Sequence, residues 1–153
     1  MELRRVRLDD ATVTPLLAGL AHEYDTRYGS NGELARTTAD EFDPPGGAFI
    51  VVLDGDVTAA GGGFRRFSEG AAEIKRMWTN PSHRRRGLAT EVLAALEAAA
   101  AEAGYTRLVL ETGPRQPEAR SLYEGRGYRS IPTYGPYDQA LAFELELLDR
   151  LAP

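Results

Sequence analysis

Apolar residues recur at helical spacing in several stretches of the chain. The clearest is the stretch 87–103, where Leu88, Val92 and Leu96 share one face and Gly104 follows as a stop signal. The other helices are predicted over residues 14–28, over residues 33–42, and from Pro117 to about residue 125.

Shorter apolar or alternating runs predict strands between these helices. Residues 49–53 are typical of a buried strand, Asp54-Gly55 is a hairpin signal, and residues 57–67 form the return strand. Three glycines in that return strand, 61–63, are unusual, because glycine weakens a strand unless a backbone or ligand must approach closely. Further strands are predicted over 3–8, 72–79, 107–111, 128–131 and 141–147, the last being compatible with a helix by propensity. The order of elements indicates a mixed α/β domain rather than a regular βαβ repeat.

Composition narrows the class of protein. The 153 residues are 42% apolar and 27% charged, which predicts one globular domain over residues 1–153. No stretch has signal-peptide or bilayer-spanning character, so a soluble, cytoplasmic protein without membrane contact is expected. The net charge of -5 argues against nucleic acid as the main partner. Without cysteine, and with only His22 and His83, neither a cysteinyl acyl-enzyme nor a metal site is expected.

The segment 84–90 joins a predicted strand to the clearest helix and has the chemistry of an anion site. The first amides of a helix lack intrahelical partners, and the helix dipole adds about half a positive charge there. Gly87 and Ala89 leave the backbone open to phosphate oxygens, and Arg84, Arg85 and Arg86 add positive charge. Neither the Walker ending nor the dinucleotide-binding glycine spacing is present. A plain basic helix start is the alternative interpretation.

The surroundings of this loop resemble a known family. The segment 84–89 matches the Gln/Arg-x-x-Gly-x-Gly/Ala signature of the GNAT superfamily of N-acetyltransferases. A Glu-Ile-x-x-Met-x-x-x-Pro strand precedes it, and Ala119, the Leu122-Tyr123 pair and Gly127-Tyr128 follow in the family order. The resemblance implies an α/β (α+β) GNAT fold, with a twisted, mostly antiparallel mixed sheet of about seven strands and about four helices. Two central parallel strands, 73–79 and 107–111, would splay apart.

The resemblance also implies that acetyl-coenzyme A (acetyl-CoA) is the cosubstrate. Its pantetheine arm would pair with the backbone of Met77, Trp78 and Thr79, and Tyr123 would lie beside it. Gln116 stands where the family usually has asparagine, so its expected contact with pantetheine is in doubt. The pyrophosphate would be held by the backbone of Arg84, Arg85, Arg86, Gly87, Leu88, Ala89 and Thr90.

Three residues are candidates for proton transfer. Glu73 has the family offset from Arg84 of a general base, although it could be an exposed strand residue paired with Lys75 or Arg76. Glu111, at the end of the neighbouring strand, is the rival base. Tyr123 matches the tyrosine that protonates the leaving sulfur, and the alternative is a tyrosine that only packs on the core.

The acceptor is the least determined partner. Tyr24, Tyr28, Tyr134 and Tyr137 fall in segments that flank the acceptor site in the family, and they could equally be surface aromatics or a homodimer contact. Arg65, Arg66 and Arg76 could bind an acceptor carboxylate or belong to a solvated strand face. We therefore expect acetyl transfer to a primary amine of an amino acid-like molecule or peptide. The alternatives are a polycationic acceptor (aminoglycoside, polyamine or protein amine), a non-catalytic acetyl-CoA-binding module, and nucleic-acid binding through the arginines.

Overall fold

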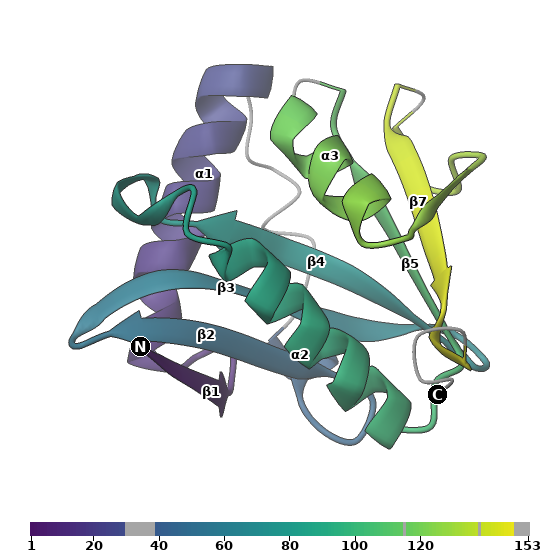
Figure 1. Cartoon of the computed structure of the whole chain (residues 1–153), viewed down its shortest axis with the longest axis horizontal. Helices are drawn as coiled ribbons and strands as arrows, with labels where there is room; N and C mark the ends of the chain where they lie inside the picture. Colours follow the sequence, from purple (N-terminus) through teal and green to yellow (C-terminus); the bar gives the residue numbers. More distant parts are fainter. Residues whose placement is uncertain (30–38, 115, 138, 149–153) are drawn as a thin grey trace.

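The computed structural model describes residues 1–29, 39–114, 116–137 and 139–148, without the side chains of Tyr28, Ala39 and Pro117. These residues form a sheet of seven strands in the order β1-β2-β3-β4-β5-β7-β6 (Figure 1). The strands are β1 (Glu2–Val6), β2 (Ala48–Asp54), β3 (Val57–Ser68), β4 (Ala71–Thr79), β5 (Arg107–Thr112), β6 (Arg129–Ile131) and β7 (Leu141–Glu146). The helices are α1 (Thr14–Tyr28), α2 (Leu88–Glu102) and α3 (Pro117–Gly125), with short 3-10 turns η1 (Ala11–Val13), η3 (Ala39–Phe42) and η4 (Pro81–His83).

The mixed α/β fold and most of its elements agree with the sequence pattern. The segment 141–147 is a strand through Glu146, so the helical alternative was wrong. Pairing with β5 and β6 decides between the two, because local propensity is a weak prior that tertiary context overrides. Most of the predicted helix over 33–42 lies outside the described residues, and its described end, Ala39–Phe42, is a 3-10 turn.

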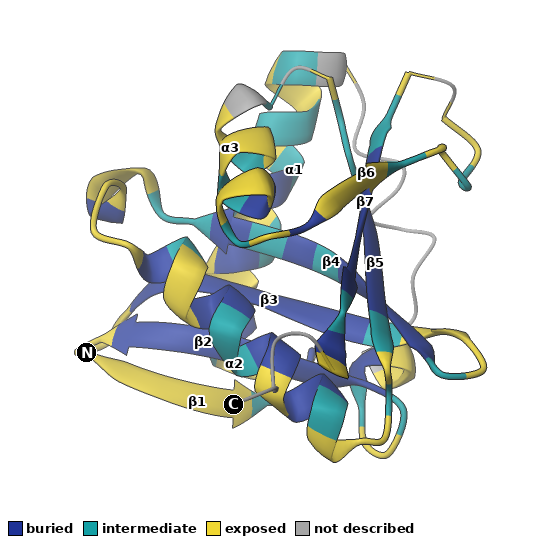
Figure 2. Ribbon diagram, turned by 45° about the vertical axis from the view of Figure 1, so that its right-hand side comes forward, coloured by how far each residue is buried: buried dark blue, intermediate teal, exposed yellow. Residues whose placement is uncertain are grey.

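The two helical layers cover opposite faces of the sheet (Figure 1). On one face, α2 and α3 pack over an apolar cluster that includes Ile74, Leu93 and Leu110. On the other face, α1 and the 3-10 turns enclose a smaller cluster around Phe49 and Trp78. Figure 2 shows that β2 to β5 are largely buried, whereas the edge strand β1 is exposed. A core on both faces holds the central strands rigidly, which suits them to position a site.

Parallel pairing of β4 with β5 is confined to the beginning of the two strands. The register runs only from Ala71 opposite Arg107 to Glu73 opposite Val109. Beyond that point β4 and β5 diverge (Figure 1), while β4 stays paired with β3 and β5 stays paired with β7. The expected splay of two central parallel strands is therefore present.

A bulge interrupts β4 just beyond this point. Gly61 lies opposite Trp78 and Gly63 opposite Lys75, so one β3 residue faces two on β4, and Arg76 has a φ of 66°. A bulge of this kind changes which face the following side chains point to. Ile74 accordingly packs under α2, whereas Trp78 packs against α1.

The glycines of β3 make room for neighbouring side chains and backbone. A Cβ on Gly62 would lie 2.4 Å from the sulfur of Met77, and one on Gly63 would lie 2.5 Å from the ring of Phe49. Their occurrence within a strand, unexplained by the sequence alone, therefore follows from close packing on both faces of the sheet.

Candidate active site

A cavity of about 1320 Å³ opens where β4 and β5 separate. Its lining comes from the diverging ends of both strands, the first turns of α3, Tyr24 of α1, residues 65–67 of β3, and the segments 40–41, 43–46, 134–137 and 139–140. Because it passes through the opening in the sheet, it has walls on both faces. A bound molecule could therefore reach it from either face.

Glu73 is the last residue of β4 that is paired on both sides of the strand. Its side chain lines the cavity and is only 7% exposed. Oε1 accepts a hydrogen bond from Nε of Arg65 at 3.1 Å and lies 3.0 Å from Nη2 in the same ion pair, and Oε2 accepts a hydrogen bond from the hydroxyl of Tyr134 at 2.8 Å. Glu73 is thus a buried carboxylate bound to Arg65, which contradicts the alternative of an exposed strand residue.

Glu111 contacts the backbone of a loop, whereas Glu73 contacts an arginine side chain. Its Oε2 accepts hydrogen bonds from the backbone N–H groups of Tyr134 and Gly135, at 3.0 and 3.1 Å. A Cβ on Gly135 would lie 2.1 Å from Oε1, so a larger residue here would displace this carboxylate. The two carboxylates that the sequence proposed as rivals therefore contact the same loop from adjacent strands.

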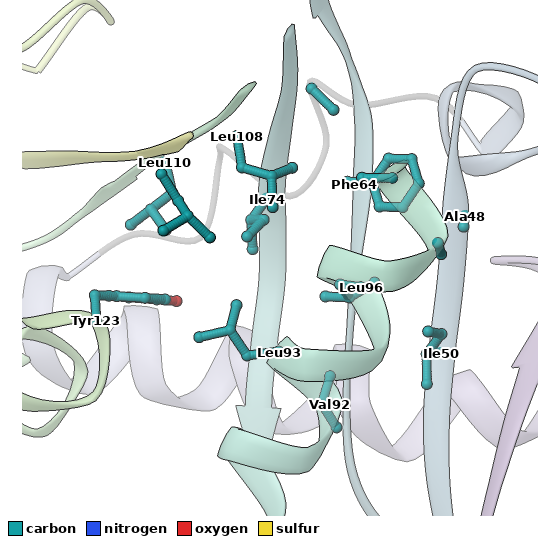
Figure 3. Close-up of a cluster of buried hydrophobic side chains, with 14 of the residues drawn as sticks. Ala48, Ile50, Phe64, Ile74, Val92, Leu93, Leu96, Leu108, Leu110 and Tyr123 are labelled. Carbon is teal, nitrogen blue, oxygen red and sulfur yellow. The ribbon is translucent and has the colours of Figure 1, made fainter. Parts of the chain in front are cut away.

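Tyr123 packs in the core and also lines the cavity. Its ring lies 5.6 Å from that of Tyr128 and 5.9 Å from that of Phe143, and the residue is 4% exposed. Figure 3 shows its hydroxyl directed away from α3, toward Leu93 and the strand that carries Ile74. Burial raises the pKa of the Tyr123 hydroxyl, so it is neutral at physiological pH and can act as a hydrogen-bond donor. Packing and a chemical role are compatible for this residue.

Gln116 organises the start of α3. Its Oε1 accepts hydrogen bonds from the hydroxyl of Thr112 and the backbone N–H of Gly113, both at 3.1 Å. The side chain also lines the cavity. Glutamine thus bridges the end of β5 and the loop before α3, a contact that the sequence did not indicate.

The segment 84–90 has backbone geometry suited to an anion. Arg85 and Gly87 both have positive φ, 66° and 75°, and α2 begins at Leu88 without a side-chain cap. Its first N–H groups are therefore free of the side-chain acceptor that commonly satisfies them, and residues alternating into left-handed geometry form anion-binding concavities. Arg84, Arg85, Arg86 and Gly87 are exposed, as is Thr90, whereas Leu88 is buried and Ala89 half-buried.

Two contacts that sequence reasoning missed fix this loop from neighbouring elements. His83, in η4, shares a hydrogen bond of 2.9 Å between its Nε2 and Asp54 of the β2–β3 hairpin. Nη2 of Arg84 donates to Oε1 of Glu23, on α1, at 3.0 Å. Burial raises the pKa of Glu23, and the positive charges of Arg27 and Arg84 oppose that shift. Glu23 is distant from the loop in sequence, and His83, which directly precedes it, belongs to no motif. No sequence signal therefore identified the two contacts.

The three β4 residues expected to pair with pantetheine are differently placed. Met77 lines the cavity, Trp78 is buried against Gly19 of α1, and Thr79 is half-buried at the end of β4. Within the described residues, β5 pairs with β4 only through Glu73. The backbone of 77–79 that faces β5 is therefore open to an extended ligand.

Most of the residues expected near the acceptor surround the same cavity. Tyr24, Tyr134 and Tyr137 line it, as does Arg76, which is 5% exposed and lies in the bulge. Arg76 is therefore not part of a solvated strand face. The side chain of Tyr28, at the end of α1, lies outside the described part of the structure.

Arg65, which the sequence offered as a possible ligand of an acceptor carboxylate, instead binds two carboxylates of the chain. It joins Glu73 to Glu41 of η3, with Nη1 of Arg65 2.7 Å from Oε2 of Glu41. Cross-strand register could have indicated it, because Arg65 lies directly opposite Glu73 on β3. A register shift between Arg66 and Ser68 lies between this pair and the β3–β4 turn, so counting residues from the turn could not fix the pairing.

Among the described residues no group of three or more histidine, cysteine or carboxylate side chains is arranged to hold a metal ion. In the same residues, no helix is both long enough and apolar enough to cross a membrane.

Comparisons with known proteins point to one family. The sequence profile described as "Acetyltransferase (GNAT) family" matches residues 16–128. The Bacillus subtilis protein named "Uncharacterized N-acetyltransferase YsnE" is 36% identical over 93 residues, a match that covers 60% of this chain and 62% of that relative.

Solved structures share the fold. A GNAT-family acetyltransferase from Staphylococcus aureus superposes with a TM-score of 0.80 at 13% identity, over 95% of this chain and 99% of that one. The PaiA N-acetyltransferase from Thermoplasma acidophilum, solved in complex with coenzyme A, has a TM-score of 0.72 at 13% identity, over 95% and 99% of the two chains.

Proposed function

This chain belongs to the acetyltransferase (GNAT) family, and from that premise we propose that it transfers acetyl from acetyl-CoA to a primary amine of a small amino acid-like molecule or peptide. The observation that carries the proposal is the cavity at the β4–β5 opening, which has Glu73 and Tyr123 in its lining. Proton acceptor and proton donor thus line one space, as acyl transfer to an amine requires.

The geometry supports binding of acetyl-CoA through the chain's backbone. The positive-φ loop before α2 supplies N–H groups for the pyrophosphate, and the open edge of β4 supplies them for the pantetheine amides. Coenzyme A in the Thermoplasma acidophilum neighbour supports this choice of cosubstrate. The same β4 backbone is suited to stabilise the oxyanion that forms when the thioester carbonyl is attacked.

The reaction proceeds by direct attack in a ternary complex. Glu73 takes up the proton that the acceptor ammonium releases, and the amine nitrogen then forms a bond to the thioester carbon. The carbon–sulfur bond breaks, and Tyr123 donates a proton to the leaving sulfur. The chain contains no cysteine to form an acyl-cysteine intermediate, so positioning of the two substrates contributes much of the acceleration.

One exposed arginine in the cavity lining supports a carboxylate-bearing acceptor. Arg65 is already bound to Glu41 and Glu73, but the neighbouring Arg66 lines the cavity with an exposed side chain. A guanidinium in the lining matches an acceptor carboxylate in a bidentate geometry. A cytoplasmic location and a homodimeric state stay predictions from the sequence.

Release of free thiol from acetyl-CoA, measured with a panel of amines, tests the proposal. We expect turnover with amino acids or short peptides, and we expect isothermal titration to detect acetyl-CoA binding without an acceptor. Turnover only with polyamines, aminoglycosides or basic proteins would replace the acceptor class by the polycationic one. Binding of acetyl-CoA with no turnover of any amine would favour a non-catalytic module.

A further inference from the structure

We propose that Tyr134 is a further catalytic residue, whose hydroxyl carries the proton from the acceptor ammonium to Glu73. The proposal rests on the proposed function, acetyl transfer to an amine, and assigns the route by which that amine becomes a nucleophile. It concerns a residue of the β6–β7 connection, far in sequence from both Glu73 and Tyr123.

Both carboxylate oxygens of Glu73 are already engaged. Arg65 forms an ion pair with Oε1 and donates a hydrogen bond to it, and the Tyr134 hydroxyl donates one to Oε2 at 2.8 Å. Glu73 is also almost completely buried. The Tyr134 hydroxyl already occupies Oε2 and also lines the cavity, so an acceptor nitrogen in the cavity can reach that oxygen through the phenol.

Tyr134 is held in this position from three directions. Its backbone N–H donates to Oε2 of Glu111 at 3.0 Å, and the next N–H, of Gly135, donates to the same oxygen at 3.1 Å. Its ring packs against Phe67 of β3 with centroids 4.8 Å apart and the rings tilted by 63°. A residue fixed by backbone, ring and hydroxyl contacts loses little entropy on binding substrate, which favours a defined proton path.

The hydroxyl has the chemistry of a relay. A phenol donates one proton and accepts through its lone pairs, so it can give a proton to Oε2 while it receives one from an ammonium. Burial raises the pKa of Tyr134, and the adjacent charge of Glu73 raises it further. The phenol thus stays protonated at rest and is ready to donate.

The proton transfer balances in one step. The ammonium N–H bond breaks as its proton passes to the Tyr134 oxygen, and the phenol O–H bond breaks as that proton passes to Oε2 of Glu73. The products are a neutral amine, an unchanged neutral phenol and a neutral carboxylic acid. Arg65 keeps its bonds to Oε1 throughout and orients the carboxyl group.

Tyr134→Phe tests the relay, because phenylalanine keeps the ring against Phe67 and removes only the hydroxyl. With an amine that the wild-type chain acetylates, we expect kcat/KM at neutral pH to fall by about 10²-fold. The loss should shrink at alkaline pH, where the amine deprotonates without help. Acetyl-CoA affinity by isothermal titration and the melting temperature should stay at wild-type values.

The matched control is Tyr105→Phe, which removes another half-buried tyrosine hydroxyl, one that donates to the Gly46 carbonyl at 2.6 Å. It should keep the wild-type rate and pH profile. A double variant with Glu73→Gln adds a second readout. Because both groups act on one proton path, the kcat/KM of the double variant should be no lower than that of the less active single variant.

Several results would overturn the relay. They are a wild-type pH profile in Tyr134→Phe, a loss of equal size at every pH, and losses that multiply in the double variant. The last two would make Tyr134 a structural support of the loop. Failure of the proposed function is distinguishable, because the wild-type chain would then release no thiol with any amine of the panel.

Discussion

The two halves of β4 share one strand but not the same neighbours. Its first half, through Glu73, is hydrogen-bonded to β3 on one side and to β5 on the other. Its second half keeps β3 as a partner, whereas its other edge faces the cavity. Backbone groups that lack a partner in the fold are satisfied by water or by a ligand.

This difference shows that the site forms where β4, within the described residues, lacks a strand partner on one edge, and that no special loop is needed to create it. Helices cover both faces of the sheet, so the opening stays rigid even though two neighbouring strands separate. Glu73 lies at the boundary between the halves. Changes on the open side should affect chemistry and leave stability intact, whereas changes on the closed side should do the reverse.

The largest expected effect concerns Tyr123, across the open side of β4. Tyr123→Phe keeps the ring between Tyr128 and Phe143 and removes the hydroxyl that would protonate the leaving sulfur. We expect kcat to fall by about 10²–10⁴-fold with unchanged acetyl-CoA affinity. Steady-state kinetics and calorimetry measure the two quantities, and a wild-type rate would assign Tyr123 to packing alone.

Glu73→Gln sharpens the comparison at the boundary itself. We expect kcat/KM at neutral pH to fall by about 10²-fold and to recover partly at high pH, because the amine then loses its proton unaided. Glu111→Gln is the control on the neighbouring strand. Because Glu111 holds the loop at Tyr134 and Gly135, its loss should raise the KM of the amine and leave the shape of the pH profile unchanged. The opposite pattern would make Glu111 the base.

Gly63→Ala examines the packed part of the sheet away from the cavity, where β3 pairs with β2. The added methyl group would meet the Phe49 ring and the Ala48 carbonyl oxygen, 2.5 and 2.8 Å from the new carbon. We expect the free energy of unfolding in urea to fall by about 1–3 kcal/mol. Gly125→Ala, where a Cβ meets nothing within 4 Å, should be neutral or slightly stabilising. Equal stability of the two variants would contradict the close packing.

The smallest expected effect lies outside the cavity, in the loop before α2. Gly87→Glu places a carboxylate where we propose the pyrophosphate binds, and we expect the Kd of acetyl-CoA to rise by about tenfold, or ~1.4 kcal/mol. Gly87→Asn is the control, because asparagine tolerates the positive φ without adding charge. Similar affinities for the two variants by titration would place the pyrophosphate elsewhere.

The sequence predicted the elements that form the opening better than the contacts among the side chains inside it. Helical spacing of apolar residues located α2, and a short apolar run, 108–110, located β5. Motif order then placed Glu73 on β4 and Tyr123 on α3, and both line the cavity. The partnership of Glu73 with Arg65 and Tyr134 was not predictable, because it joins strands and a loop whose contacts depend on register and topology.

The separate placement of the two loops has an evolutionary consequence. The segment before α2 and the segment that carries Tyr134 belong to different parts of the chain, and β7 lies between β5 and β6 so that the second segment returns across the cavity. If the segment 134–137 contacts the acceptor as proposed, substitutions there alter which amine is accepted without disturbing the helix start at Leu88. Selection can act on the two halves of the reaction independently, so one scaffold can diversify its acceptors while it keeps a common acyl donor.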